Sequence, residues 1–275
     1  MKKRNVELVI ISDVHLGTYG SHAKELNNYL STIKPKTLVL NGDIIDAWQF
    51  RKSYFPKAHL RVIQRIIGMA SKGTKVYYIT GNHDEILRKF SDMTMGNFSL
   101  VDKLVLELDD DKKAWIFHGD VFDASVQHSK WIAKLGGLGY DYLILMNRFA
   151  NWCLAKLGRE PYSFSKKIKA SVKKAVKFIS DFETTATDLA IEKNYDYVIC
   201  GHIHEPKILT KENKHGSTLY LNSGDWVENL TALEYHKKRW KLYSYTHTNF
   251  TEEENLFEME DILTSQMLSN IILKK

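Results

Sequence analysis

The chain has 275 residues, of which 44% are hydrophobic and only 4 are proline, so it can bury a large core and is not intrinsically disordered. Its two cysteines, Cys153 and Cys200, are far apart in apolar surroundings, which argues against a disulfide framework and fits a reducing compartment. The net charge of +6 alone says little about partners.

The N-terminus is basic, but its short apolar run leads straight into acidic residues, which is not the pattern of a signal peptide. No apolar run approaches the ~20 residues that a membrane-spanning helix needs. These features predict a cytoplasmic protein.

The first part of the chain alternates predicted strands and helices. Apolar spacing predicts helices over 23–34 and 58–70, which end near Pro35 and Gly73. Short β-rich runs predict strands at 6–11, 37–40 and 75–80. This order favours parallel β-α-β units.

Further along, a polar turn separates two apolar runs at 104–108 and 114–117, which predicts a β-hairpin. Strand and helix then alternate again, and the chain ends in an acidic and apolar segment that favours a peripheral helix. The remaining predicted elements are a helix at 182–193, strands at 197–200, 218–222, 231–235 and 241–245, and the helix at 251–275.

Residues 123–180 differ in composition. They contain a glycine-rich hinge at 135–139, an aromatic and apolar helical run at 140–157 and a basic helix at 165–179, with 11 Lys plus Arg against 3 Asp plus Glu. We expect a single domain, 1–275, with 123–180 inserted as a helical lid. Its apolar face would take an acyl chain, and its lysines would meet phosphate or an anionic membrane. Alternatively, the apolar stripe is core and the lysines are a solvated face.

Five predicted strands end in side chains that commonly bind metals. Asp43 is notable because it follows a buried strand and a glycine, and a buried carboxylate is costly unless it is paired or bound to metal. The five segments are Asp13-Val14-His15, Gly42-Asp43, Gly81-Asn82-His83-Asp84, His118-Gly119-Asp120 and Gly201-His202-Ile203-His204.

These segments are expected to meet, because the carboxyl ends of the strands in an open α/β sheet form the ligand crevice. Asp-x-His and His-x-His would place two side chains on the same side of an extended segment. Imidazole, carboxylate and amide ligands together suit Mn, Fe or Zn better than Ca or Mg. Two such ions polarise a phosphoryl group and generate hydroxide at neutral pH.

The ordered set of motifs DVHLG (13–17), GDIID (42–46), GNHDE (81–85), HGD (118–120) and GHIH (201–204) resembles the calcineurin-like metallophosphoesterase family. The resemblance implies an α/β fold in which two sheets form a sandwich flanked by helices, with two divalent ions at one edge. Mn is the ion it favours, and Fe or Zn are the alternatives.

The resemblance also implies a role for each site residue. One metal would be held by Asp13, His15 and His204, the other by Asn82, His118 and His202, and Asp43 would bridge them. A bridging water or hydroxide would attack phosphorus in line. His83 would contact the phosphate and help the leaving group depart, and Asp84 would orient His83, as carboxylates around metal sites commonly do.

Longer matches resemble the UDP-2,3-diacylglucosamine diphosphatase group, which acts in lipid A synthesis: GDIIDAW (42–48), GNHDEILR (81–88), HGDVFD (118–123) and NSGDWVEN (222–229). The implied reaction hydrolyses the pyrophosphate to UMP and an acylated sugar phosphate, at the periphery of the inner membrane. Candidates for phosphate or uridine contacts are Arg51, Arg88, Arg148 and Lys169. One position departs from that group, which commonly has Arg where this chain has His83, so a related lipid-linked or nucleotide pyrophosphate is an alternative substrate.

Two other functions fit the motifs less well. A nuclease or other phosphodiesterase could use the basic insertion to contact a nucleic acid backbone, but long aliphatic residues rather than exposed aromatic ones are interleaved with its lysines. A non-catalytic scaffold would have lost ligands, whereas all seven ligand positions and His83 are present. The oligomeric state is not predicted by any of these patterns.

Overall fold

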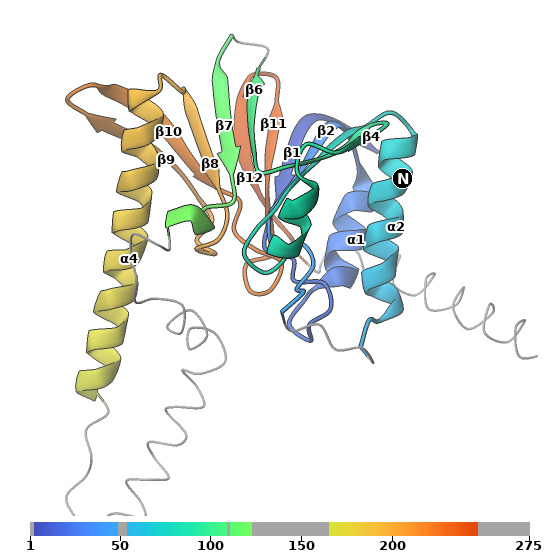
Figure 1. Ribbon diagram of the computed structural model, residues 1–275, viewed down its shortest axis with the longest axis horizontal. Helices are drawn as coiled ribbons and strands as arrows, with labels where there is room; N and C mark the ends of the chain where they lie inside the picture. Colours follow the sequence, from blue (N-terminus) through green and yellow to red (C-terminus); the bar gives the residue numbers. More distant parts are fainter. Residues whose placement is uncertain (1–2, 49–53, 109–110, 123–164, 247–275) are drawn as a thin grey trace, which may run out of the picture.

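The computed structural model describes residues 3–48, 54–108, 111–122 and 165–246, whose strands form two mixed sheets (Figure 1). The seven-stranded sheet has the order β12-β11-β1-β2-β3-β5-β4, and the five-stranded sheet has the order β6-β7-β8-β10-β9. The strands are β1 (Arg4–Ile11), β2 (Ile33–Asn41), β3 (Lys75–Ile79), β4 (Thr94–Met95), β5 (Phe98–Val101), β6 (Lys103–Glu107), β7 (Lys113–Phe117), β8 (Tyr197–Cys200), β9 (Lys207–Asn213), β10 (Gly216–Asn222), β11 (Thr231–His236) and β12 (Arg239–Ser244).

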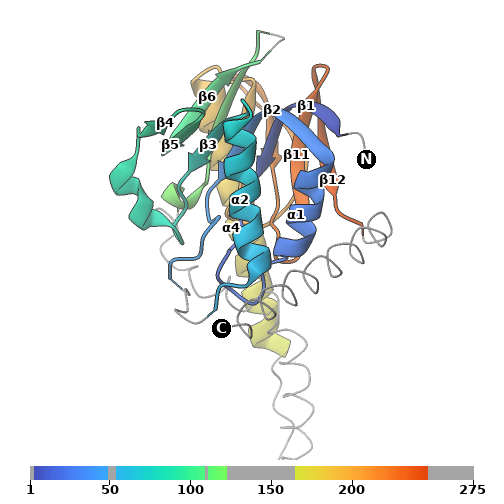
Figure 2. The ribbon, with the colours of Figure 1, turned by 90° about the vertical axis from the view of Figure 1, so that its right-hand side faces the viewer.

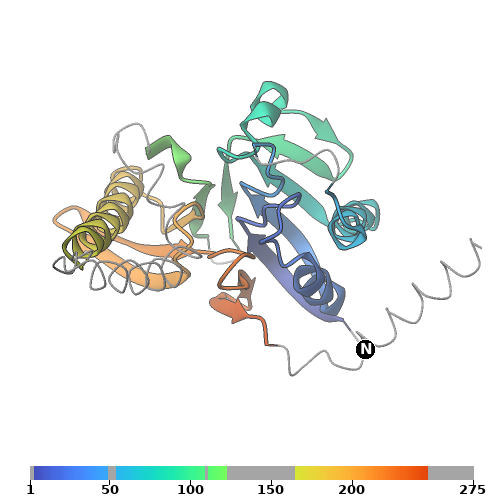
Figure 3. The same ribbon diagram turned by 90° about the horizontal axis from the view of Figure 1, so that it is seen from below.

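Helices cover the outer faces of both sheets, which gives the order helix, sheet, sheet, helix (Figure 3). Helices α1 (Ala23–Thr32) and α2 (Lys57–Ser71) lie side by side on the seven-stranded sheet (Figure 2). Helix α4 (Ser165–Glu192) lies on the five-stranded sheet. Two 3-10 helices, η1 (Glu85–Phe90) and η2 (Asp120–Phe122), lie between strands. This architecture confirms the predicted two-sheet core flanked by helices.

Strand periodicity separates the core into layers. On β1, Ile10 points into the space between the sheets, whereas Val9 and Ile11 pack under α1 and α2. A third layer of the core lies between α4 and the five-stranded sheet and includes Phe182 and Tyr220. Because side chains alternate along a strand, a strand segment buried on both faces is a continuous apolar run, as residues 8–11 of β1 are.

The predicted parallel units are present: β1, β2 and β3 pair in parallel, and β6 and β7 form the predicted antiparallel hairpin. The first helix is shorter than predicted. It ends at Thr32, and β2 begins at Ile33, two residues before Pro35, because a residue that precedes proline is driven into extended backbone. Strands β4, β5 and β9 were not predicted, since their apolar runs are short or their faces are exposed.

Two separate helices were predicted where the structure has the single helix α4. Ser180 and Asp181, which lie between the two predicted helices, are neither glycine nor proline, so nothing breaks the backbone hydrogen bonding there. The predicted lid spans 123–180. Its residues 123–164, with the aromatic run at 140–157, lie outside the described residues, as does the predicted helix at 251–275. The lid and the single-domain boundary therefore stay predictions.

Within the described ranges, no helix is both long enough and apolar enough to cross a membrane.

An ion pair between the half-exposed Arg4 and the buried Glu234 ties the N-terminus of β1 to β11 and gives a stability prediction. Arg4 donates to both carboxylate oxygens of Glu234 at 2.8 and 3.0 Å, and the Tyr29 hydroxyl donates to Glu234 at 2.9 Å. Burial alone would raise the pKa of Glu234, but the Arg4 and Tyr29 hydrogen bonds hold the pKa below its ordinary value. The Glu234 contribution to the free energy of unfolding is therefore present above about pH 4.5 and is lost as the pH falls through the lower, folded-state pKa.

We expect Glu234→Gln to lower the free energy of unfolding at pH 7 by about 1–2 kcal/mol, because it removes a charged hydrogen-bond acceptor from a buried network. Denaturant unfolding at pH 7 and pH 3 measures this effect, and the difference from the wild type should shrink at pH 3. Glu7→Gln is the control, since the Glu7 side chain, which pairs with His236, is more exposed than Glu234 and the loss of its charge should cost about 0.5 kcal/mol or less. Equal effects of both substitutions would contradict this account.

Candidate metal centre

Loops at the carboxyl ends of β1, β2, β3, β7 and β8 bring the predicted ligands to one edge of the sandwich. One ligand atom from each of Asp13, His15 and His204 lies within 4.8 Å of the others, and the same holds for Asp43, His118 and His202. Within these groups, His204 Nε2 is 3.1 Å from Asp13 Oδ1, and His118 Nε2 is 3.3 Å from Asp43 Oδ2. These gaps are close to those between ligand atoms that share an ion at about 2.0–2.2 Å.

Five of the seven candidate ligands have backbone in the left-handed region. The φ angles are 52° at Asp13 and His15, 53° at Asp43, 66° at His202 and 54° at His204. Non-glycine residues adopt this conformation at a cost, and such residues cluster at functional sites. The expectation that Asp-x-His and His-x-His act as extended segments is therefore wrong. Tight loops aim these side chains, and His202 and His204 belong to different groups.

Buried polar atoms that lack a well-aligned hydrogen bond support metal binding at this edge. Among the described residues, Asp13 Oδ1, Asn82 Oδ1 and His118 Nε2 are buried and make no well-aligned hydrogen bond. A buried polar atom without a good hydrogen bond is costly, so these three atoms are suited to coordinate a cation. Carboxylate, amide and imidazole donors suit divalent Mn, Fe or Zn, so the residues present fit two such ions.

The carboxylates strongly attract positive charge. Burial alone would raise the pKa of Asp43, but His118 lowers this pKa to about 2. Burial would likewise lower the pKa of His204, yet Asp13 raises it to about 9. A divalent cation would take the place of the histidine protons, so metal binding should release protons.

Asp46, for which the sequence motifs predicted no role, contacts two histidines. Its Oδ2 lies 3.1 Å from His15 Nδ1 and 2.9 Å from His83 Nδ1, and its side chain is 1% exposed. Asp46 therefore occupies the position that Asp84 was expected to hold. The signal was in the GDIID motif, where a second carboxylate follows Asp43 by three residues.

Asp84 instead fastens the loop that carries Asn82 and His83. Its Oδ1 accepts a hydrogen bond from Gly81 N at 2.6 Å, and its Oδ2 accepts from Ile44 N at 3.0 Å and from the Tyr78 hydroxyl at 2.5 Å. The prediction that Asp84 orients the His83 ring is thus wrong, because these bonds hold its carboxylate against the backbone.

The NSGDW segment (222–226) contacts the backbone and side chains of the group formed by Asp13, His15 and His204. The Trp226 amide donates to the Asp13 carbonyl at 3.0 Å, and Trp226 is fully buried against Tyr29. Asp225 accepts from three successive amides that follow it, and its Oδ2 lies 3.9 Å from His204 Nδ1. This segment therefore fixes the backbone around Asp13 and His204.

Comparison with known proteins decides the family. The model of the calcineurin-like phosphoesterase family matches residues 6–206, well over half of the chain. The chain belongs to the calcineurin-like phosphoesterase family. It is accordingly a phosphoester hydrolase, and the five ligand-bearing segments begin within the matched residues.

Curated relatives of this calcineurin-like phosphoesterase share one name, UDP-2,3-diacylglucosamine hydrolase. The protein from Blochmanniella pennsylvanica is 26% identical over 218 residues, which cover 74% of this chain and 81% of the relative. The protein from Aliivibrio fischeri is 24% identical over 245 residues, with 86% and 97% covered. The protein from Hamiltonella defensa is 26% identical over 207 residues, with 73% and 78% covered.

The four basic residues that were expected to contact substrate are placed only in part. Arg88 forms an ion pair with Asp120 and donates from Nε to Thr80 Oγ1 at 3.2 Å, so it is held within the fold of the phosphoesterase. Arg51 and Arg148 lie outside the described residues. Lys169 is on α4, in a part of the helix whose side chains are not described. Their substrate contacts stay predictions.

Gly81 gives a sharp test of how closely the loops of this phosphoesterase approach each other. A Cβ at this position would lie 2.2 Å from Asp43 Oδ1 and 2.8 Å from His118 Nε2. We expect Gly81→Ala to weaken Mn²⁺ binding by about tenfold or more, because Asp43 and His118 must shift. Titration of Mn²⁺ by calorimetry measures this.

Gly68→Ala is the matched control, since a Cβ at Gly68 meets nothing within 4 Å. It should leave Mn²⁺ affinity unchanged and stabilise α2 by about 0.5–1 kcal/mol. Equal Mn²⁺ affinities for the two variants would contradict the packing described around Gly81.

Proposed function

We propose that the chain is a two-metal pyrophosphatase that hydrolyses UDP-2,3-diacylglucosamine, or a closely related lipid-linked nucleotide sugar, to UMP and the acylated sugar 1-phosphate. The convergence of two ligand groups at one edge, Asp13, His15 and His204 beside Asp43, His118 and His202, carries this proposal. The names of the curated relatives supply the substrate.

In this proposal Asp13, His15 and His204 hold one ion, Asn82, His118 and His202 hold the other, and Asp43 contributes to both. The ions, with Mn²⁺ the first candidate and Fe or Zn the alternatives, would activate water and offset charge on the phosphoryl oxygens. Asp13 Oδ1, Asn82 Oδ1 and His118 Nε2, which are buried and make no well-aligned hydrogen bond, support this assignment.

His83 is proposed to donate a proton or hydrogen bond to the phosphoryl group or the leaving oxygen. Its backbone amide donates to Asp43 Oδ1 at 2.8 Å, which places it beside the proposed bridging carboxylate. Burial alone would lower the pKa of His83, but the Asp46 hydrogen bond raises this pKa above its ordinary value, which favours the protonated ring. Since Asp46 contacts Nδ1, Nε2 is the ring nitrogen that remains for the substrate.

Mass spectrometry of UMP released from UDP-2,3-diacylglucosamine with added Mn²⁺ tests the proposal. We expect metal-dependent release of UMP and sugar phosphate, with little cleavage of single-stranded DNA, the substrate of the alternative nuclease function. Turnover of simple phosphomonoesters alone would refute the proposed substrate. The expected contact with an anionic membrane rests on the insertion at 123–180 and stays a prediction.

A further inference from the structure

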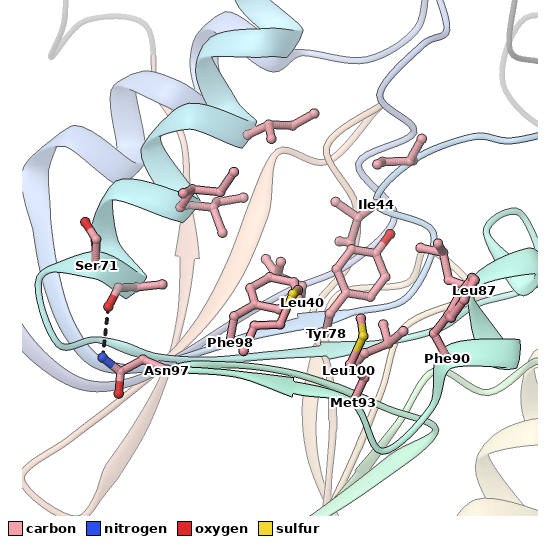
Figure 4. Close-up of a pocket in the computed structure, with 17 residues that line it drawn as sticks. Leu40, Ile44, Ser71, Tyr78, Leu87, Phe90, Met93, Asn97, Phe98 and Leu100 are labelled. Atoms are coloured by element: carbon pink, nitrogen blue, oxygen red, sulfur yellow. Dashed lines mark hydrogen bonds between the residues drawn. The ribbon is translucent and has the colours of Figure 1, made fainter.

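An apolar cavity of about 660 Å³ lies between α2 and the outer face of the seven-stranded sheet (Figure 4). Leu40, Tyr78, Phe98 and Leu100 rise from the strands, and Leu87 and other apolar residues of the η1 region close the far side. Its volume falls within the range of ~300–1,000 Å³ that is typical of small-molecule sites. The cavity is thus large enough for part of a ligand rather than only for one or two water molecules.

The walls offer nothing to a polar ligand. No charged side chain lines the cavity among the described residues, and the polar side chains that line it already have partners. Tyr78 donates its hydroxyl to Asp84, Asn97 Nδ2 donates to the Ala70 carbonyl at 3.0 Å, and Ser71 Oγ donates to Gly68 at 3.0 Å. A polar occupant would lose its hydration without gaining hydrogen bonds, so the chemistry of the walls selects an aliphatic ligand.

The mouth of the cavity exposes large apolar side chains to solvent. Ile67 on α2 is 58% exposed, Phe90 on η1 is 55% exposed and Met95 on β4 is 57% exposed. Single exposed apolar residues are ordinary, but several around one opening mark a site of interaction.

The cavity shares a wall with the candidate metal centre. Ile44 and Ile45, which line it, are the two residues between Asp43 and Asp46. On the other side, the Tyr78 hydroxyl binds the carboxylate of Asp84, the residue that fastens the His83 loop. The loops that carry the site residues therefore also form the wall of the apolar cavity.

We propose that this cavity holds an acyl chain of the substrate whose pyrophosphate lies at the adjacent metal centre. The inference rests on the proposed function, because a diacylated sugar brings aliphatic chains next to the phosphates. The apolar run at 140–157, which is part of the segment predicted from sequence to take an acyl chain, lies outside the described residues. The described part of the chain thus supplies an acyl site of its own.

Ile67→Trp tests the proposal, because a larger side chain at the exposed mouth should obstruct the cavity without entering the core. Leu60→Trp is the matched control, since Leu60 is on the same helix, is 48% exposed and does not line the cavity. Met95→Trp obstructs the mouth from β4 and guards against a defect particular to α2. Circular dichroism and thermal unfolding confirm that each variant is folded.

Two readouts separate this inference from the proposed function. The first is fluorescence titration with cis-parinaric acid, a free fatty acid, which needs neither metal nor catalysis. We expect Ile67→Trp and Met95→Trp to weaken its binding at least tenfold, and Leu60→Trp to change it less than twofold, since the methylenes kept out of the apolar site lose their favourable transfer from water. The second is KM for UDP-2,3-diacylglucosamine, which should rise similarly, while turnover of acyl-free bis(p-nitrophenyl) phosphate stays unchanged.

Absence of parinaric acid binding, or equal losses in Ile67→Trp and Leu60→Trp, would overturn the cavity as an acyl site. If the mouth variants weaken binding of the probe but leave KM for the diacylated substrate unchanged, the assignment of the cavity to the acyl chain of the substrate is overturned. If no UDP-linked lipid is hydrolysed at all, the proposed function fails, and the probe titration alone still decides whether the cavity takes an aliphatic chain.

Discussion

Asp43→Ala is expected to abolish metal-dependent hydrolysis, with a loss in kcat of at least about 10³-fold, equivalent to about 4 kcal/mol. Asp43 is 2% exposed, its Oδ2 lies 3.3 Å from His118 Nε2, and its Oδ1 accepts the His83 amide. Removing its carboxylate leaves His118 buried without its negative neighbour and takes away the proposed bridge between the ions. The measurement is the initial rate on bis(p-nitrophenyl) phosphate with saturating Mn²⁺.

Asp120→Ala is a suitable comparison for Asp43→Ala. Asp120 is an acidic residue beside the site that pairs with Arg88 and belongs to neither candidate ligand group. The Asp120→Ala variant should keep its rate of hydrolysis within about tenfold of the wild type. Unchanged kcat in Asp43→Ala would rule out the bridging role.

Asp46→Asn is the second substitution with a large expected effect, a loss of about 10²-fold in kcat, because one carboxylate oxygen positions both His15 and His83. A neutral amide oxygen in the same place accepts more weakly from the two rings than a carboxylate oxygen does, and the charge that raises the pKa of His83 disappears. The midpoint of the His83 titration, followed by NMR of its ring, should therefore move to lower pH. A merely structural role for Asp46 would not produce that shift.

Asp84→Asn distinguishes the role of the Asp84 carboxylate from that of the Asp46 carboxylate. Because Asp84 binds Gly81 N, Ile44 N and the Tyr78 hydroxyl, its replacement should lower thermal stability more than Asp46→Asn does, and its effect on the His83 titration should be smaller. A larger shift of the His83 pKa in Asp84→Asn than in Asp46→Asn would restore the assignment that the sequence suggested.

The motifs predicted which residues meet but not how the backbone brings them together. Each predicted strand ends close to its expected residue, and the order of the segments suffices to place Asp13, Asp43 and His118 at one edge, since parallel strands share a carboxyl end. The left-handed backbone at Asp13 and His204 was not predicted, because non-glycine residues rarely adopt it and nothing local requires it.

Tertiary contacts explain the remaining differences. The partner of His83 depends on which of two carboxylates, Asp46 or Asp84, the fold turns toward it, and both are equally plausible in sequence. The apolar cavity likewise cannot be predicted from a sequence pattern, because its walls come from α2, β2, β3, β4, β5, η1 and the loop after β2, and each contributes apolar residues that would otherwise be assigned to the core.

The number of Mn²⁺ ions that each chain binds tests the central claim most directly. Mass spectrometry under native conditions, on protein loaded with Mn²⁺ and freed of excess metal, should show two ions per chain in the wild type and a loss of metal in Asp43→Ala. One ion per chain in the wild type, or two ions retained in Asp43→Ala, would contradict a two-metal centre bridged by Asp43.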